Sequence, residues 1–521
     1  MNSSNKVPIL MHHSISHINL PKNNIDEKIN EISRSKNFFK EEFNIDVNFF
    51  SYPYGSYDNE TVKIIKKYYK FAVTTRRSRY IKDKFNEHLL PGVPVNKNDS
   101  LIKFFLKKKH HMKILNIKMT KKYNYPLLSN AFNSKDINEG VKVLKTKFIT
   151  MSKITEKFEN YFAKKMGSKF AVMTNSGSSA NLLALSCLTH PLNKEKLLSQ
   201  DEVIIPAICW STTLWPIIQN NLKPIFVDVD LNSFNIDTTK IINKINKRTK
   251  AIMLVHVLGT STNMSKLVKI AKKYKLKIIE DTCESLGAEY NNKKLGTIGN
   301  FGTYSFYYSH QITSGEGGMI VCDNLQDYNI LKTLRSHGWS RNTSFHNSFK
   351  KKYKMLDDKF LFIGPGYNVR PTDIQAAIAL NQFKRLNKFI KVRDNNRNKI
   401  IKTLQKHKKW DNQFKFVIAD KKIKPSWFGL PIQINDKFLK NKKKFLDFLS
   451  FKGIETRPII SGNFLNQPAS KIYKFNSKKN DFMNANEIEK KGFFIGLHTK
   501  PIKLDELEFI AENLLKINLF K

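Results

Sequence analysis

The segment TNSGSSANLLAL at Thr174–Leu185 combines glycine and hydroxyl residues in a pattern suited to holding a phosphate. An apolar segment comes before it and a helical pattern follows, which would place Ser178 and Ser179 in the first turn of a helix. Free N–H groups and the helix dipole favour an anion there. A serine that only caps the helix gives the same pattern, so both interpretations stay open at this point.

A second chemical group, Asp281, directly follows the apolar segment LKIIE. Ligands of open α/β sheets bind at the carboxyl ends of strands, and a carboxylate there can hold a pyridinium N–H by a charge-assisted hydrogen bond. That bond makes the pyridine ring a better electron sink. A helix-capping role explains Asp281 equally well from this motif alone.

Further along the chain, GTYSFYYSHQITSGEGGMIV joins a strand pattern to a glycine-rich turn. Gly315, Gly317 and Gly318 allow close backbone approach or left-handed dihedral angles. His310 lies between the strand and the turn, and a histidine can accept and return a proton near neutral pH.

Short apolar segments alternate with amphipathic stretches after about residue 125, and this alternation must position the groups above. The apolar segments are KFAVMTNS, EVIIPA, KPIFVDVD, AIMLVHVLG, LKIIED and TYSFYY. Near-continuous apolar strands between helices predict a mostly parallel sheet covered on both faces. From about Pro425 the pattern becomes that of a smaller α+β unit, with a strand in SWFGLPIQI and a helix over residues 438–453.

The segment KKKHHMKILNIKMTKKYNYP is basic, shows no alternation and ends in proline, which indicates a linker. We therefore expect an N-terminal part over residues 1–106, a linker over 107–124, a large domain over 125–420 and a small C-terminal domain over 421–521.

Composition gives one unusual value, a formal net charge of +46 from 90 Lys and Arg against 44 Asp and Glu. Such a charge suggests a nucleic-acid or membrane-surface partner. The basic residues are spread along all 521 residues, and no zinc-finger, RRM-like or helix-turn-helix motif accompanies them. Compositional drift of an AT-rich genome is the favoured explanation, so no nucleic-acid partner is expected.

Four widely separated cysteines, Cys187, Cys209, Cys283 and Cys322, form no CxxC pair and no disulfide framework. This usage indicates a reducing compartment. No apolar run approaches the roughly 20 residues of a membrane span, and residues 1–10 lack the pattern of a signal peptide. We expect a cytoplasmic protein without a membrane partner.

In order and spacing, the motifs from about Tyr125 onwards resemble the DegT/DnrJ/EryC1/StrS family of sugar aminotransferases and dehydratases that depend on pyridoxal 5'-phosphate (PLP). The resemblance implies the aspartate-aminotransferase fold, an α/β fold with a large mixed, mostly parallel sheet domain and a smaller α+β C-terminal domain. It also implies cofactor contacts, namely Ser178, Ser179 and Ser305 at the phosphate, Trp210 stacked on the ring, Asp281 at the pyridine nitrogen, Glu284 on the 3-hydroxyl side, and Asn368 at the phosphate of the neighbouring subunit. The contact from Asn368 implies a homodimer with shared active sites.

One departure from the family pattern changes the expected chemistry. His310 stands where the aminotransferases have the lysine that binds the cofactor covalently, and the nearest lysines, Lys294 and Lys332, lie outside the motif. This exchange is typical of the nucleotide-sugar 3-dehydratases, and RSHGWSR, GYNVRPTDIQ and GIETRPIISGNFLNQP resemble the branch that acts on GDP-4-keto-6-deoxy-mannose. A degenerate, inactive aminotransferase is the alternative interpretation.

The dehydratase resemblance implies that L-glutamate supplies the amino group that turns PLP into pyridoxamine 5'-phosphate (PMP). His310 would remove the C4′ proton as a general base while the C3 hydroxyl leaves, giving a 4-keto-3,6-dideoxy sugar for surface polysaccharide biosynthesis. The residues expected to contact the nucleotide-diphosphate sugar or glutamate are Arg370, Arg457, Asn463 and His337. An ordinary surface position for Arg457 and a structural role for His337 explain these two residues as well.

Alternative functions remain at this stage. A second dehydratase branch acts on CDP-sugars with an iron–sulfur cluster held by closely spaced cysteines, but residues 340–366 contain no cysteine, so no cluster is expected. A nucleotide-sugar aminotransferase and a non-catalytic basic scaffold are the other candidates.

The first hundred residues contain His13 and His17, four apart, a spacing suited to two ligands of one metal. Together with YPYG at Tyr52–Gly55, they resemble the polysaccharide deacetylase (NodB-like) family over about residues 7–96. That family also needs paired aspartates from an earlier strand, and the twelve residues before His13 contain no acid. We expect a partial α/β segment with a vestigial histidine pair and no metal, or a half that needs a partner chain.

Overall fold

The computed structural model describes residues 11–12, 16, 18–43, 46–74, 89–91, 123–129, 131–475 and 479–520. Two compact units are present, residues 1–121 and residues 122–521. Of the linker predicted over residues 107–124, only residues 123 and 124 are described.

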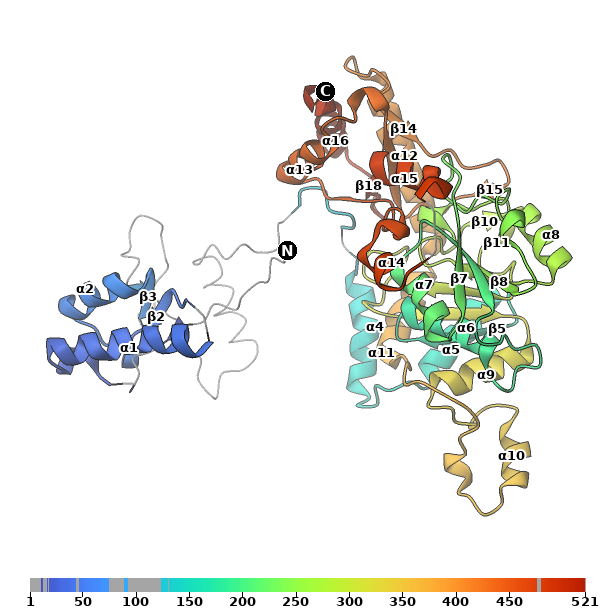
Figure 1. Cartoon of the computed structure of the whole chain (residues 1–521), viewed down its shortest axis with the longest axis horizontal. Coiled ribbons are helices and arrows are strands. Elements are labelled where there is room, and N and C mark those ends of the chain that lie inside the picture. Colours follow the sequence, from blue (N-terminus) through green and yellow to red (C-terminus); the bar gives the residue numbers. More distant parts are fainter. Residues whose placement is uncertain are drawn as a thin grey trace. The chain divides into compact units, whose positions relative to one another are not determined.

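The first unit contains a parallel sheet in the order β1-β2-β3-β4. Its strands are β1 (Met11–His12), β2 (Phe49–Ser51), β3 (Phe71–Thr74) and β4 (Leu90–Pro91). Helices α1 (Ile25–Phe43) and α2 (Asn59–Tyr68) connect successive strands, because parallel neighbours need a crossover. The expected partial α/β segment is therefore present (Figure 1).

The structure describes the YPYG motif of this unit but not its histidine pair. Tyr52 is buried in the apolar core, whereas Tyr54 adopts a left-handed backbone conformation with φ of 58° and is exposed. His13 and His17 lie outside the described residues, so their vestigial metal role stays a prediction.

A seven-stranded sheet forms the centre of the second unit, in the order β5-β13-β12-β9-β8-β6-β7. Its strands are β5 (Phe170–Thr174), β6 (Glu202–Pro206), β7 (Lys223–Val227), β8 (Thr249–Val255), β9 (Lys277–Asp281), β12 (Phe301–Ser305) and β13 (Gly318–Cys322). Only β13 runs antiparallel to its neighbours, so the large mixed, mostly parallel sheet is confirmed.

The helices of the second unit are α4 (Ser134–Lys145), α5 (Lys153–Met166), α6 (Gly177–Thr189), α7 (Ser211–Gln219), α8 (Met264–Tyr274), α9 (Leu325–Arg335), α10 (His346–Lys352), α11 (Asp373–Phe383), α12 (Leu386–Lys406), α13 (Lys442–Lys452), α14 (Pro468–Ile472), α15 (Met483–Lys491) and α16 (Leu504–Leu515). Most of these helices pack around the large sheet, whereas α13 and α16 belong to the C-terminal part and α10 projects away from the sheets (Figure 1). Helix α6 carries no charged residue and is buried along most of its length, as expected for a helix enclosed by other elements.

The smaller sheet is antiparallel, in the order β14-β16-β18-β17. Its strands are β14 (Phe414–Phe416), β16 (Gly429–Ile434), β17 (Thr456–Arg457) and β18 (Gly492–Gly496). Strand β15 (Ile423–Lys424) instead joins β10 (Glu289–Tyr290), which also pairs with β11 (Lys293–Lys294). Strand β14 of the smaller sheet therefore lies before the boundary predicted at residues 420–421. Strand β15, which belongs to a separate three-stranded sheet, lies after it.

Strand register brings three distant parts of the chain to one edge of the large sheet. Thr303 lies opposite Asp281, and Gly318 lies opposite both Ser305 and Thr174. Because β5, β9 and β12 run in the same direction, their carboxyl ends meet at this edge, where open α/β sheets bind ligands.

Candidate active site

Asp281 is held in one orientation at the carboxyl end of β9. Its buried carboxylate accepts hydrogen bonds from Asn181 Nδ2 at 2.8 Å, Thr213 Oγ1 at 2.7 Å and the backbone N–H of Cys283 at 3.2 Å. Thr303 in turn donates to Asn181 Oδ1 at 2.5 Å. These three donors fix the orientation of the carboxylate, and a carboxylate in this position can hold a pyridinium N–H by a charge-assisted hydrogen bond.

The first turn of α6 presents hydroxyl groups and backbone N–H groups. Ser176 caps the helix and accepts from Ser179 N–H at 3.1 Å, while Ser179 Oγ donates to Asn175 Oδ1 at 2.7 Å. Ser178 is exposed, and its hydroxyl donates to Thr212 Oγ1 at 3.0 Å. The N–H groups of Gly177 and Ser178 have no acceptor within the helix and are available to an anion.

Gly177 brings this turn into contact with the end of β12. A Cβ atom at Gly177 would lie 2.5 Å from Ser305 Cβ and 3.0 Å from Cys283 Sγ. Ser305 is buried, and its Oγ accepts from Tyr307 N–H at 3.2 Å. The three serines of the predicted phosphate site, Ser178, Ser179 and Ser305, are therefore gathered around one helix N-terminus.

Trp210 joins the same group through α7, which begins at the next residue. Its indole is 57% exposed, while Thr212 and Thr213 in the first turn of α7 bond to Ser178 and Asp281 respectively. Trp210 thus directly precedes the helix turn that contacts both Ser178 and Asp281.

Glu284 lies one turn beyond Asp281 and is half-buried. Burial raises the pKa of its carboxyl to about 7, the Leu258 N–H bonded to Oε2 at 3.0 Å lowers that pKa, and the charge of Asp281 raises it. Glu284 can therefore exchange a proton near neutral pH.

His310 follows β12 on a turn in which its N–H donates to Tyr307 O at 3.0 Å. Its ring makes edge contacts with Tyr307 and Phe428, at centroid distances of 5.9 and 5.1 Å. Burial, together with the charge of Arg393, lowers the pKa of His310 to about 3. The imidazole is therefore neutral at neutral pH, and among the described residues its buried Nδ1 has no hydrogen-bond partner.

Two side chains that the sequence did not single out fix this turn. Gln311 donates from Nε2 to Glu284 O and, at 3.1 Å, to Ser426 O. The buried Arg393 donates to His310 O at 3.4 Å and to Trp427 O at 3.2 Å. The only sequence signal for such residues is a polar side chain in an apolar context, as for Asn181 inside the uncharged helix α6.

Asn368, Arg370 and His337 form a separate cluster around Trp339. Arg370 Nε donates to Asn368 Oδ1 at 3.1 Å, its guanidinium lies 5.8 Å from the Trp339 ring, and the His337 ring lies 4.9 Å from that ring. The exposed Asn368 is next to Val369, whose carbonyl accepts from Asn175 N–H at 3.0 Å. The cluster is thus tied to the serine turn through the backbone.

The other two predicted substrate contacts lie in the small-sheet region. Arg457 on β17 is half-exposed and pairs with Glu455 at 2.7 Å. Asn463 is 2% exposed; its amide donates to Asn486 at 2.8 Å and accepts from Leu465 N–H at 3.1 Å. The next residue, Phe464, donates its N–H to the Ala207 carbonyl at 2.8 Å. This bond joins the segment to the end of the strand that precedes Trp210.

These groups fit a pyridoxal phosphate. The α6 turn offers N–H groups and hydroxyls to a phosphate, Asp281 offers an oriented carboxylate to a pyridine nitrogen, and the unpartnered Nδ1 of His310 lies on the turn that follows Ser305. Fold and site together define the class as the PLP-dependent aminotransferase fold.

Residues 131–514 match the DegT/DnrJ/EryC1/StrS aminotransferase family, and the chain belongs to that family. It is 38% identical over 391 residues to GDP-4-keto-6-deoxy-D-mannose 3-dehydratase of Escherichia coli O55:H7, covering 75% of this chain and 99% of that protein. The structure of E. coli GDP-4-keto-6-deoxy-D-mannose-3-dehydratase with bound hydrated PLP has a TM-score of 0.69 at 36% identity, covering 75% of this chain and 99% of that chain. A structure of GDP-4-keto-6-deoxymannose-3-dehydratase with a trapped PLP-glutamate geminal diamine has a TM-score of 0.68 at 36% identity, covering 75% of this chain and all of that chain.

At the N-terminus, residues 9–70 match the polysaccharide deacetylase family, which confirms the predicted resemblance of this segment. Among the described residues, no helix has the length and apolar character needed to cross a membrane.

The contact at Gly177 gives a direct test of the site geometry. Gly177→Ala should destabilise the protein by about 1–3 kcal/mol because the new methyl group overlaps Ser305 and the α6 turn must shift. Gly140→Ala in α4 is the matched control, since its methyl would meet only the flexible end of Ile378 at 3.2 Å. Chemical denaturation of both variants measures the difference; equal midpoints would contradict the close packing at Gly177.

Proposed function

We propose that this chain is a PLP/PMP-dependent 3-dehydratase of a nucleotide-linked 4-keto-6-deoxy sugar of the GDP-4-keto-6-deoxy-mannose type. The observation that carries the proposal is His310, a neutral base on the turn where aminotransferases have their lysine. Similarity to 3-dehydratases over three quarters of the chain supports the same reaction. The product would be a 4-keto-3,6-dideoxy sugar.

We assign the cofactor contacts by their positions. Ser178, Ser179 and Ser305 would hold the phosphate at the α6 N-terminus, and Trp210 would cover one face of the ring. Asp281 would hold the proton on the pyridine nitrogen, since its carboxylate is already oriented by Asn181 and Thr213. Glu284, whose carboxyl pKa is raised to about 7, adds a second titratable group next to Asp281.

A bound cofactor would supply an electron sink, the chemistry that loss of the C3 hydroxyl requires. His310 would supply the base for the C4′ proton, because a neutral imidazole carries the nitrogen lone pair that accepts a proton. A histidine forms no stable covalent bond with the cofactor, so it leaves the cofactor free throughout elimination. We propose L-glutamate as the amino donor, in agreement with the PLP-glutamate adduct in the solved relative.

Different observations support the roles of the four predicted substrate contacts. Arg370 and His337 surround Trp339 with a cationic and aromatic surface suited to a nucleotide diphosphate, and half-exposed Arg457 is accessible to one. The amide of Asn463 is engaged by Asn486 and Leu465, so we propose that Asn463 orders the segment beside Trp210.

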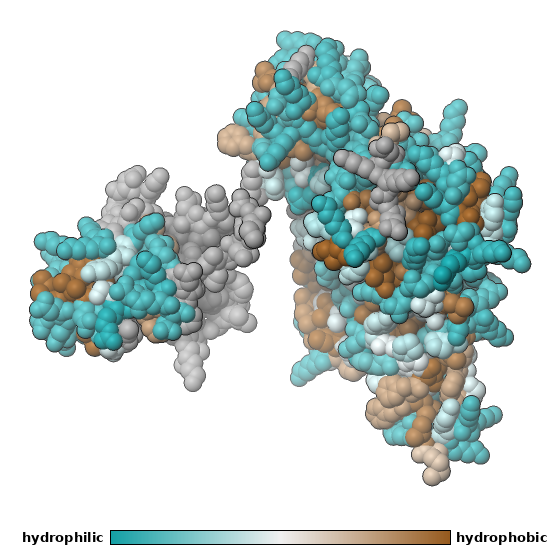
Figure 2. All heavy atoms as spheres, in the orientation of Figure 1, coloured by the Kyte–Doolittle hydropathy of each residue, from teal (hydrophilic) through white to brown (hydrophobic). Residues whose placement is uncertain are grey.

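We also propose a homodimer with shared active sites. Ile137, Val141 and Leu144 are exposed along one face of α4, as their spacing requires. A second apolar surface surrounds α10, where Met355 is 97% exposed and Phe362 57% exposed (Figure 2). Apolar surfaces of this kind are typical of interfaces between copies.

We place the protein in the cytoplasm. All four cysteines are free, which agrees with a reducing compartment.

The reaction is tested by incubating the full chain with PLP, L-glutamate and GDP-4-keto-6-deoxy-mannose and measuring the product mass. Loss of the C3 hydroxyl with retention of the 4-keto group is expected, since His310 permits elimination and hydrolysis. CDP- and dTDP-linked 4-keto sugars serve as controls for the nucleotide. An amino sugar as the main product would contradict the dehydratase and support an aminotransferase.

His310 has its own test. His310→Asn should lower kcat by about 10²- to 10⁴-fold, because the general base is removed. The dissociation constant of PMP should stay within about threefold of the wild-type value, since His310 moves a proton and does not anchor the cofactor. Spectral titration measures the second quantity. Activity equal to that of the wild type would contradict the role of His310.

Shared sites predict complementation between two inactive variants. Asn368→Ala removes the contact given to the partner, and His310→Asn removes the base within its own subunit. Co-expression should restore about one quarter of the wild-type activity, because random pairing makes half of the dimers mixed and each mixed dimer has one intact site. Coexpressed subunits that stay inactive, or a monomeric enzyme in sedimentation, would contradict shared sites.

A further inference from the structure

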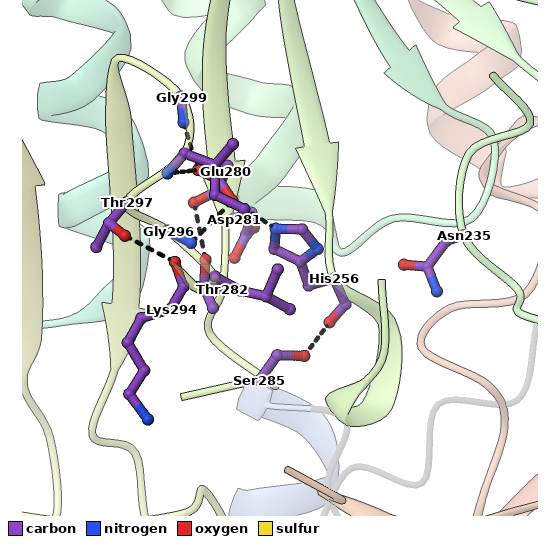
Figure 3. Close-up of polar contacts among 12 residues, drawn as sticks. Asn235, His256, Glu280, Asp281, Thr282, Ser285, Lys294, Gly296, Thr297 and Gly299 are labelled. Carbon is purple, nitrogen blue, oxygen red and sulfur yellow. Dashed lines mark hydrogen bonds and ion pairs between the residues drawn. The ribbon is translucent and has the colours of Figure 1, made fainter. Parts of the chain in front are cut away.

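A buried hydrogen-bonded pair, His256 and Glu280, lies at the residue before Asp281. His256 and Glu280 are both completely buried, and His256 Nε2 lies 2.9 Å from Glu280 Oε2 (Figure 3). The cofactor contacts proposed above include neither residue. A buried polar group is costly unless its hydrogen bonds are satisfied, so the partners of Glu280 indicate what holds it in place.

Glu280 is fully paired. Besides His256, its Oε2 accepts from Gly296 N–H at 2.8 Å, and its Oε1 accepts from the N–H groups of Ile298 at 2.8 Å and Gly299 at 2.6 Å. Four donors match the acceptor capacity of a carboxylate. Its orientation is therefore fixed, and His256 must donate through Nε2 because every other partner of Glu280 is also a donor.

Glu280 and Asp281 are consecutive residues of β9, so the hydrogen bonds that fix Glu280 also restrain the backbone at Asp281. Successive side chains of a strand project from opposite faces, so the two carboxylates lie on different sides of β9. Asn181 and Thr213 hold Asp281 on its own side. His256 contacts both residues, since its backbone N–H also donates to Asp281 O at 3.0 Å.

His256 also begins the turn that holds Glu284. Ser285 Oγ donates to His256 O at 2.6 Å and accepts from Gly259 N–H at 3.0 Å. Between these bonds, Leu258 has a left-handed φ of 49° and directs its N–H to Glu284 Oε2 at 3.0 Å. His256 thus links the end of β9 at Asp281 to the turn whose Leu258 N–H donates to Glu284.

We propose that His256, acting through Glu280, is a positioning residue that sets the Asp281 carboxylate against the pyridine nitrogen and the Leu258 N–H against Glu284. The inference rests on the proposed function, because the pyridine belongs to the cofactor assigned there. Because His256 is completely buried, we assign it no direct contact with cofactor or substrate.

The test compares three variants of the full chain with PMP as the probe, because PMP lacks the aldehyde that would react with surface lysines. His256→Leu removes the donor to Glu280, whereas His256→Gln keeps an amide donor. His190→Asn is the matched control: His190 is also buried, accepts from Leu192 N–H at 3.2 Å, and follows the opposite end of α6 from Ser178.

His256→Leu should weaken PMP binding about 10- to 100-fold, the effect of losing one hydrogen bond to a buried charge. His256→Gln should stay within about threefold of the wild type, and so should His190→Asn. The absorbance change that reports deprotonation of the bound pyridine should move about one pH unit lower in His256→Leu, because a displaced Asp281 holds the ring proton less strongly. Stability alone would not move this transition.

A milder variant covers the case in which His256→Leu does not fold. Ser285→Ala loosens only the turn and should weaken PMP binding about 3- to 10-fold. PMP affinity and pyridine transition equal to the wild type in the folded variants would overturn the inference, as would an equal loss in His190→Asn. A wild-type chain that does not bind PMP would instead overturn the proposed function.

Discussion

Strand β9 ends on two consecutive buried carboxylates, and the geometry of the site depends on satisfying both. Glu280 receives four N–H donors on one face of the sheet, and Asp281 receives three hydrogen bonds from Asn181, Thr213 and Cys283. Burying either carboxyl group without these partners would be costly. As a result, α6, α7, the turn after β8 and the loop before β12 are all fixed relative to the same strand end.

Burial and hydrogen bonds also fix the turn that carries His310. His310 is enclosed by aromatic rings and lies near the charge of Arg393, and both effects favour the neutral imidazole. Gln311 and Arg393 bind the turn to backbone carbonyls on either side. A base that is neutral, oriented and unable to form a stable covalent bond with the cofactor suits elimination better than transfer of an amino group.

Several parts of this arrangement follow from the sequence. Alternation of apolar and amphipathic segments predicted the large sheet, and the order of the motifs identified the family that residues 131–514 match. The motifs placed Ser178 at a helix start, Asp281 at a strand end and His310 between a strand and a turn, where the structure has them. Asn181, Gln311 and the His256–Glu280 pair were not predicted, because a side chain's partner across the sheet leaves no pattern along the chain.

The charge of +46 remains best explained by composition, since it is spread over the whole sequence. The sequence by itself determined the fold class, the family and the exchange of lysine for histidine, because these depend on local periodicity and on residue identity within motifs. Only the tertiary structure decided that His310 is held neutral, that Glu284 titrates near neutrality and that Asn463 is engaged within the protein. Burial, desolvation and long-range hydrogen bonds set these properties, and they arise when segments distant in the chain are packed together.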